Sequence, residues 1–167
     1  MKISTTRFGD ITIDESRVIQ MKGGILGFER LNRYVLFTHS ENTPFLWLQS
    51  IDDGSIAFIV INPFIVTPEY QCVTSDSDTR FLGIESPDDV VLLSIVTIRS
   101  KPFKVTANLR APLVINQRNS FGKQVVLDNS DYPIQYSLTF NKLSPEEHLS
   151  MDKEKHSEIK NISTALT

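Results

Sequence analysis

The stretch PFLWLQSIDDGSIAFIVINPF at residues 44–64 places two apolar runs on either side of Asp52-Asp53-Gly54. In the first run, Phe45, Trp47 and Ile51 share one face with Gln49, and the alternate residues form the other face, which is the period of two of a β-strand. An Asp-Gly pair supplies the positive φ angles that tight hairpin turns favour. The stretch therefore predicts a β-hairpin with strands over residues 45–51 and 56–61.

A second apolar run, VVLLSIVTI at residues 90–98, is apolar on both alternating faces. A strand that buried only one face would carry polar residues at every second position. Because full burial of one large aliphatic side chain is worth about 1.5–3 kcal/mol, exposure of either face to water would be costly. We therefore expect a central strand that is covered on both sides.

Shorter runs with the same period occur along most of the remaining chain, with Gly or Pro at nearly every junction. No amphipathic helix of 10 to 15 residues alternates with them, as a parallel sheet would require. One short interior helix is expected at residues 77–82, and Gly83 is expected to end it. The predicted fold class is all-β, a compact antiparallel β-barrel or sandwich-like single domain. Its further strands are expected near residues 3–5, 11–13, 18–19, 34–37, 70–74, 104–108, 112–116, 123–127 and 134–138.

The composition changes after Leu138, where four Lys stand against five acidic residues and large apolar residues are few. Ser144, Pro145 and Glu147 have the spacing of a helix start with a capping box. We therefore divide the chain into a barrel-like domain at residues 1–138 and a charged tail at residues 139–167. The tail is expected to be a marginal helix or disordered.

Composition and charge exclude several classes of protein. The 167 residues carry a net charge of -3 and 40% hydrophobic residues, which is typical of one globular domain without the basic stripe of a nucleic-acid binder. The single cysteine cannot form an internal disulfide, and neither a secretion signal nor an apolar run of about 20 residues is present. We expect a cytoplasmic protein, a monomer, that binds neither nucleic acid directly nor a membrane.

Catalytic and metal sites find little support in the sequence. The three histidines, His39, His148 and His156, lack metal-ligand spacing to each other and to Cys72. The adjacent carboxylates of the Asp-Asp pairs are expected to face water, and Cys72 is expected to be a small buried hydrophobe. The sequence therefore predicts no enzyme, no cofactor and no metal.

One acidic segment, residues 76–89, places five acids in fourteen residues, and within it only Arg80 opposes them. It is either an ordinary solvated loop or an acidic rim that steers a basic partner, with neighbouring apolar side chains as anchors. Its acids are Asp76, Asp78, Glu85, Asp88 and Asp89. Trp47 also has two interpretations. It is either a core residue or part of a binding surface at the hairpin tip with Asp52 and Asp53.

Four motifs stand out along the chain. They are GGILGFE at residues 23–29, PFLWLQSIDD at 44–53, TANLRAPLVIN at 106–116 and GKQVVLDNSDYPI at 122–134. Together these motifs resemble the FliW family of flagellar assembly factors. Their order and spacing also match, and the resemblance covers residues 1–138.

The resemblance implies a non-enzymatic protein with two partners. A family member binds the translational regulator CsrA, which relieves CsrA's repression of flagellin mRNA translation, and it binds flagellin in a partner switch. The alternative is a flagellin-specific chaperone or structural binding module without CsrA antagonism. Candidate contact residues are Trp47 with the hairpin tip, the acids of the segment 76–89, and Asn108 and Tyr132 from the motifs.

Overall fold

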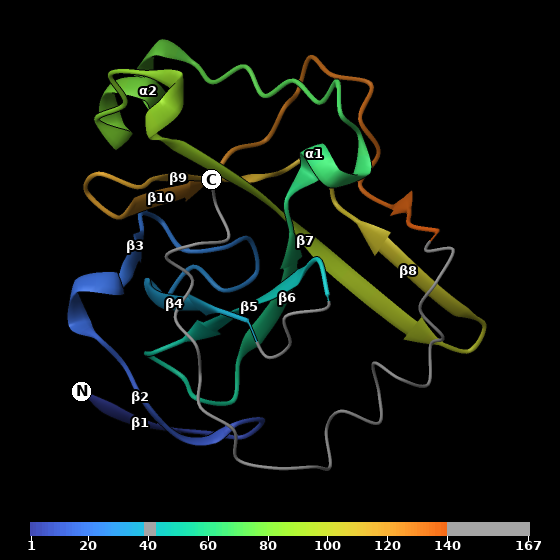
Figure 1. Cartoon of the computed structure of the whole chain (residues 1–167). Helices are drawn as coiled ribbons and strands as arrows, with labels where there is room; N and C mark the ends of the chain where they lie inside the picture. The colour runs from blue at the N-terminus through green and yellow to red at the C-terminus, as the bar shows by residue number, and fades with distance from the viewer. Residues whose placement is uncertain (39–42, 140–167) are drawn as a thin grey trace.

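The computed structural model describes residues 1–38 and 43–139, in which β-strands predominate (Figure 1). The N-terminal half contains β1 (Lys2–Thr5), β2 (Gly9–Thr12), β3 (Ile19–Met21), β4 (Arg33–Phe37), β5 (Phe45–Ser50) and β6 (Ala57–Ile61). The C-terminal half contains β7 (Val90–Ser100), β8 (Phe103–Ala107), β9 (Leu113–Asn116), β10 (Phe121–Gln124) and β11 (Tyr136–Ser137). The helices are α1 (Pro63–Val66) and α2 (Asp76–Leu82), with 3-10 turns η1 (Glu15–Arg17) and η2 (Pro87–Asp89).

Seven of the strands close into a barrel, in the order β7-β6-β5-β4-β3-β10-β9, and the pairing of β7 with β9 completes the ring. The long strand β7 makes this possible. Its first half pairs with β9 from Val90 to Leu93, and its second half pairs with β8 from Val96 to Ser100. The hairpin of β7 and β8 therefore projects beyond the barrel, as Figure 1 shows. The predicted all-β barrel is confirmed.

The barrel interior is a closed apolar cluster to which six of the seven barrel strands contribute. Its members include Met21, Tyr34, Leu48, Val60, Leu93 and Leu113, all of them fully buried. A second cluster covers the outer face of β7 and includes Ile61, Val96, Ala107 and Leu82. The third fills the space between the β1–β2 ribbon and the outer face of β4 and β5, around Val35 and Phe37.

The expectation of a strand covered on both faces is confirmed for β7. Val91, Leu93 and Ile95 belong to the interior cluster, whereas Leu92 and Val96 on the alternate face belong to the outer cluster. This double burial explains why the strand lacks polar residues at alternate positions over most of its length.

The hairpin of β5 and β6 is confirmed, but the predicted reason for its glycine is wrong. Gly54 does not adopt a positive φ angle, unlike Gly23, Gly24 and Gly27 in the GGILG loop. A Cβ atom at Gly54 would instead lie 2.0 Å from the carbonyl oxygen of Ser4. The Gly54 carbonyl also accepts a hydrogen bond from the amide of Thr6 at 3.0 Å. Glycine is therefore required because the hairpin tip packs directly on the backbone at the end of β1.

Three other predictions of secondary structure need correction. Residues 70–74 do not form a strand, because they run as an extended segment whose side chains pack on the outer cluster without a partner strand. The strand expected at residues 123–127 is β10, which begins two residues earlier and ends at Gln124. The strand at residues 134–138 shrinks to the two residues of β11.

The short helix is confirmed as α2, one residue longer than expected at its start. Its N-cap is Ser75, and Gly83 ends it in the left-handed conformation with a φ of 65°. Helix α1 was not expected, although Asn62 followed by Pro63 is a typical helix start. The predicted helix start at residues 144–147 and the three histidines lie outside the described residues.

Candidate protein-binding face

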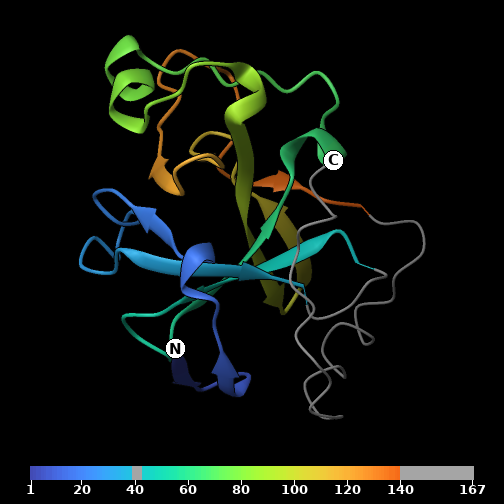
Figure 2. The same cartoon turned by 60° about the vertical axis from the view of Figure 1, so that its left-hand side comes forward.

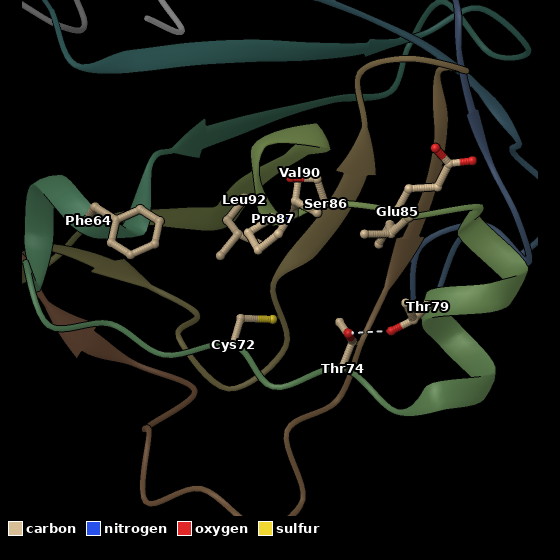
Figure 3. A pocket seen from close by; sticks show the side chains of 10 residues that line it. Phe64, Cys72, Thr74, Thr79, Glu85, Ser86, Pro87, Val90 and Leu92 are labelled. Carbon is tan, nitrogen blue, oxygen red and sulfur yellow. Dashed lines mark hydrogen bonds between the residues drawn. The ribbon is translucent and has the colours of Figure 1, made fainter.

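A pocket of about 450 Å³ opens on the outer face of β7, between the two short helices (Figure 3). Val90 and Leu92 of β7 line it, and Phe64 of α1 stands at one end. Its remaining lining residues are Cys72, Thr74, Thr79, Ile84, Glu85, Ser86 and Pro87. The lining is therefore mostly apolar, with hydroxyl groups and one carboxylate at the end near α2.

Local hydrogen bonds hold the walls of this pocket. Asn62 caps α1 by accepting a hydrogen bond from the amide of Phe64 at 2.9 Å. Ser75 caps α2 by accepting one from the amide of Asp78 at 3.1 Å. The hydroxyls of Thr74 and Thr79 lie 2.9 Å apart and join the extended segment to α2, as the dashed line in Figure 3 shows. The pocket is therefore part of the folded architecture.

Cys72 stands in the wall of the pocket, with its sulfur pointing inward (Figure 3). The prediction of a small buried hydrophobe is partly right, because the side chain is half-buried and packs on the outer cluster. Burial raises the pKa of the Cys72 thiol to about 11, so the thiol is neutral at pH 7.

Apolar side chains near the pocket stay exposed to solvent. Phe64, which lines it, is 45% exposed, and its neighbour Ile65 is 57% exposed. Val73 is 80% exposed, but it alternates with the lining residues Cys72 and Thr74 and so points away from the pocket. Since an apolar hollow with exposed apolar side chains commonly marks an interaction site, we treat this pocket face as the candidate binding surface.

The acidic segment 76–89 divides into structural acids and free acids. Asp78 forms an ion pair with Lys123 of β10, which holds the pKa of the Asp78 carboxyl below its usual value. Glu85 pairs with Arg118 at 2.7 Å. The acids are thus opposed not by Arg80 alone but also by two cations that the β9–β10 hairpin contributes.

Asp89 is the most clearly structural of the five acids. Its carboxylate is buried, accepts hydrogen bonds from the amides of Ser86 and Glu85 at 3.0 and 3.3 Å, and completes the capping box of η2. In contrast, the carboxylates of Asp76 and Asp88 have neither an ion pair nor a hydrogen bond within the part of the chain that the structure describes. These two exposed acids are the ones available to a partner.

The hairpin-tip candidates lie at the far end of the barrel from α2 (Figure 1). Trp47 packs in the third cluster, with its ring 5.2 Å from the ring of Phe8 and under the guanidinium of Arg7 at 4.7 Å. Asp53 accepts hydrogen bonds from Ser55 within its own turn, at 2.9 Å from the amide and 2.6 Å from the hydroxyl.

Asp52 fastens the hairpin tip to the start of β4. Its carboxylate accepts hydrogen bonds from the amides of Asn32 and Arg33 at 2.8 and 2.9 Å and from the Arg33 guanidinium at 2.7 Å. Burial alone would raise the pKa of Asp52, but these donors outweigh it and hold the pKa below its usual value.

The last two candidates also have contacts of their own. Asn108 accepts hydrogen bonds from the amides of Arg110 and Ala111 at 3.1 and 3.0 Å and shapes the turn before β9. The Tyr132 hydroxyl accepts one from the amide of Gln71 at 2.9 Å, and its ring lies 4.6 Å from that of Tyr70. Tyr132 therefore supports the extended segment that forms one wall of the pocket.

The fold thus brings only part of the predicted set to one face. Glu85 lines the pocket, and Asp76 and Asp88 are close in sequence to its lining residues Thr74 and Pro87, whereas Trp47, Asp52 and Asp53 are not among the lining residues. The sequence reasoning missed Phe64, although the Asn62-Pro63 helix start followed by three apolar residues could have revealed a short helix with an apolar face. Among residues 1–38 and 43–139, no three His, Cys, Asp or Glu side chains are placed to hold a metal ion. Nor is any helix there long and apolar enough to cross a membrane.

Comparison with known proteins identifies similar chains over the barrel domain. The family described as FliW protein matches residues 2–138. A flagellar assembly factor FliW from Syntrophus aciditrophicus is 51% identical over 142 residues, which cover 85% of this chain and 90% of that protein. One from Clostridium botulinum is 45% identical over 130 residues, covering 78% of this chain and 92% of that protein. A crystal structure of the flagellar assembly factor FliW superposes with a TM-score of 0.75 at 37% identity, over 86% of this chain and all of the other.

Proposed function

This chain belongs to the FliW family of flagellar assembly factors, and we propose that it is a non-enzymatic switch between two protein partners. One partner is the translational regulator CsrA, and the other is flagellin. The chain acts as a monomer in the cytoplasm, where flagellin mRNA is translated. Capture of CsrA relieves the repression of that mRNA, and unsecreted flagellin displaces CsrA and restores repression.

The observation that carries this proposal is the pocket face. It joins an apolar hollow, exposed apolar side chains and free carboxylates on a barrel whose interior is fully packed. A rigid scaffold with one such surface suits protein capture, because little conformational entropy is lost on binding. The free carboxylates of Asp76 and Asp88 suit a basic partner such as an RNA-binding regulator.

A switch requires that the two partners oppose each other's binding. A coupling free energy of about 1–3 kcal/mol is enough for a change in affinity of roughly 5- to 150-fold. Shared use of the pocket face by both partners would provide this coupling without a second conformation of the barrel.

The direct test is calorimetric titration of the protein with CsrA from the same organism, alone and after saturation with flagellin. We expect CsrA to bind and flagellin to weaken that binding at least about fivefold. A competition assay with flagellin mRNA should show release of the transcript from CsrA. If flagellin binds but CsrA stays on its transcript, the chain is a chaperone or structural binding module, and the switch is wrong.

An exposed acid on the pocket face and one in the β1–β2 ribbon provide a matched pair for this assay. Asp88→Lys should slow CsrA association, most strongly at low salt, because the Asp88 carboxylate is exposed and has no cationic partner in the described part of the chain. Asp10→Lys, in the β1–β2 ribbon at the far end of the barrel, is the control and should leave association unchanged. Asp89 is unsuitable for this purpose, since its replacement removes the capping box. Equal slowing by Asp88→Lys and Asp10→Lys would remove the pocket face from the interface.

A further inference from the structure

We propose that the pocket on β7 binds the apolar stripe of an amphipathic helix whose flanks carry Lys or Arg. The proposal deepens the proposed function, because it states which kind of protein segment occupies the pocket face. It rests on the shape of the pocket, on the apolar surface around it and on the charge of its rim.

The apolar surface extends beyond the hollow. Phe64, Leu92 and Val90 line the hollow, and Ile65, the neighbour of Phe64 on α1, is 57% exposed. A helix covers such a surface with apolar residues at i, i+3, i+4 and i+7, of which one or two enter the hollow and the others lie on its margin. A compact ligand of pocket size would leave Ile65 exposed.

The charge on the rim specifies the flanks of the helix. Asp76 and Asp88 lack cationic partners among the described residues, as does the exposed Glu69 after α1. The paired acids Asp78 and Glu85 are neutralised by the β9–β10 hairpin and add little attraction. Cationic side chains beside the apolar stripe would therefore meet three free carboxylates, whereas acidic ones would be repelled.

The construction of the pocket favours a helix over an extended strand. Strand addition uses the unpaired backbone edge of a sheet. Here β7 contributes the face of the strand, through Val90 and Leu92, and the walls come from side chains of α1, α2 and the segment between them. The recognition surface therefore consists of side chains, which suits the side-chain ridge of a helix.

Cys72 makes this proposal directly measurable. It is the only cysteine of the chain, it lines the pocket, and its sulfur points inward (Figure 3). A segment seated in the pocket must therefore shield this thiol from an alkylating reagent. Because burial raises the pKa of Cys72, alkylation is slow, and it is followed with excess reagent at pH 7.5, where maleimides still spare the lysine amines.

The experiment measures the rate of Cys72 alkylation by N-ethylmaleimide in the full chain, by mass spectrometry, with three synthetic 18-residue peptides. The first carries Leu at helical spacing with Lys at the other positions, the second replaces Lys by Glu, and the third places the same Leu and Lys residues alternately. We expect the first peptide at saturation to slow alkylation about tenfold or more. The second and third should slow it less than about twofold.

Two matched substitutions place the effect on the pocket face. Phe64→Ala should reduce the protection at least about fivefold, whereas Phe103→Ala on β8, with nearly the same exposure, should retain it. Asp88→Lys should weaken protection, and Asp10→Lys should not. Thermal unfolding of each variant verifies its fold, and the charge pair remains informative if Phe64→Ala unfolds.

Several outcomes would overturn the proposal. Equal protection by the Glu peptide would refute the cationic flanks, and equal protection by the alternating peptide would refute the helix. Protection that survives both Phe64→Ala and Asp88→Lys would place the peptide elsewhere. No peptide contains CsrA or flagellin sequence, so protection without CsrA binding would refute only the switch. CsrA binding that leaves Cys72 fully reactive would refute only the use of this pocket.

Discussion

The β1–β2 ribbon and helix α2 lie at opposite ends of the molecule (Figure 2). These two ends use aromatic and acidic side chains in opposite ways. Beside the β1–β2 ribbon, Phe37 is buried, and Asp52 accepts three hydrogen bonds. On the pocket face, Phe64 is 45% exposed, and Asp88 has no partner for its carboxylate among the described residues. The same residue types thus stabilise the fold at one end and remain available for binding at the other.

Accessibility and the number of internal contacts, more than residue type, therefore distinguish the two ends of the molecule. Trp is a residue type that is enriched in binding hot spots, and Asp52 carries a charge. The contacts of both Trp47 and Asp52 are nevertheless made within the chain. The residues of the pocket face have comparable chemistry with fewer internal contacts. Substitutions at the two ends should therefore affect different quantities.

The largest difference is expected between two phenylalanines. Phe37→Ala should lower the free energy of unfolding by about 3–5 kcal/mol, because it leaves a cavity beside Phe8 and Val35. Phe64→Ala should lower it by less than about 1 kcal/mol, because the side chain is largely exposed. Urea unfolding of both variants measures the difference. Similar losses would mean that the pocket face is as much a part of the stable core as the ribbon end.

The next effect concerns the reason for the glycine at the hairpin tip. Gly54→Ala should lower the free energy of unfolding by an amount near the upper end of about 1–3 kcal/mol, because the new Cβ would collide with the Ser4 carbonyl. Gly54→Asn should be equally harmful. At Gly27, where φ is 87° and nothing lies near the Cβ position, Asn should be better tolerated than Ala. If Asn also rescued position 54, a positive φ would be the correct explanation after all.

The smallest effect compares two adjacent carboxylates. Asp52→Asn should lower the free energy of unfolding by about 1 kcal/mol at pH 7, after allowance for solvent screening of its ion pair with Arg33. Because the pKa of Asp52 is lowered by folding, its contribution is present above the unfolded value of 3.8 and is lost as the pH falls through the folded value. The difference between Asp52→Asn and the wild type should therefore shrink as the pH falls below 3.8.

Asp53→Asn is the control for this last comparison. Its carboxylate is exposed and bonds only within its own turn, to Ser55, so its replacement should change stability less than Asp52→Asn does. Urea unfolding at pH 7 and at pH 3 compares both variants with the wild type. A loss at Asp52 that did not depend on pH would show that the amide hydrogen bonds, and not the charge, carry its contribution.

Much of the fold could be predicted because its signals are local. The apolar runs that became β5, β6 and β7 each extend over five or more residues, and the Gly83 stop of α2 follows from the conformational freedom of glycine. Residues 70–74 show where this reasoning fails. Their alternation is real, but the amide of Gln71 bonds to the Tyr132 hydroxyl instead of to a partner strand. Alternation reports which side chains are buried, and it does not report whether a neighbouring strand exists.

The candidate site could be predicted only in part, because residues far away in the sequence decide which of its acids form ion pairs. Arg118 lies 33 positions from Glu85 along the chain, and Lys123 lies 45 positions from Asp78. No pattern within residues 76–89 indicates which acids these cations neutralise. The pocket itself requires α1, α2 and β7 to meet, which is a property of the complete fold.

The amino-acid sequence by itself determined the all-β class, the double burial of β7, the end of α2 at Gly83 and the resemblance to the FliW family. These features depend on side-chain periodicity and on glycine and proline stereochemistry, which act over a few residues. Only the tertiary structure decided that β7 closes the barrel against β9, that Gly54 touches Ser4, and that Asp89 is buried while Asp76 and Asp88 are exposed. These features depend on contacts between residues far apart in the chain, and such contacts exist only once the barrel has closed.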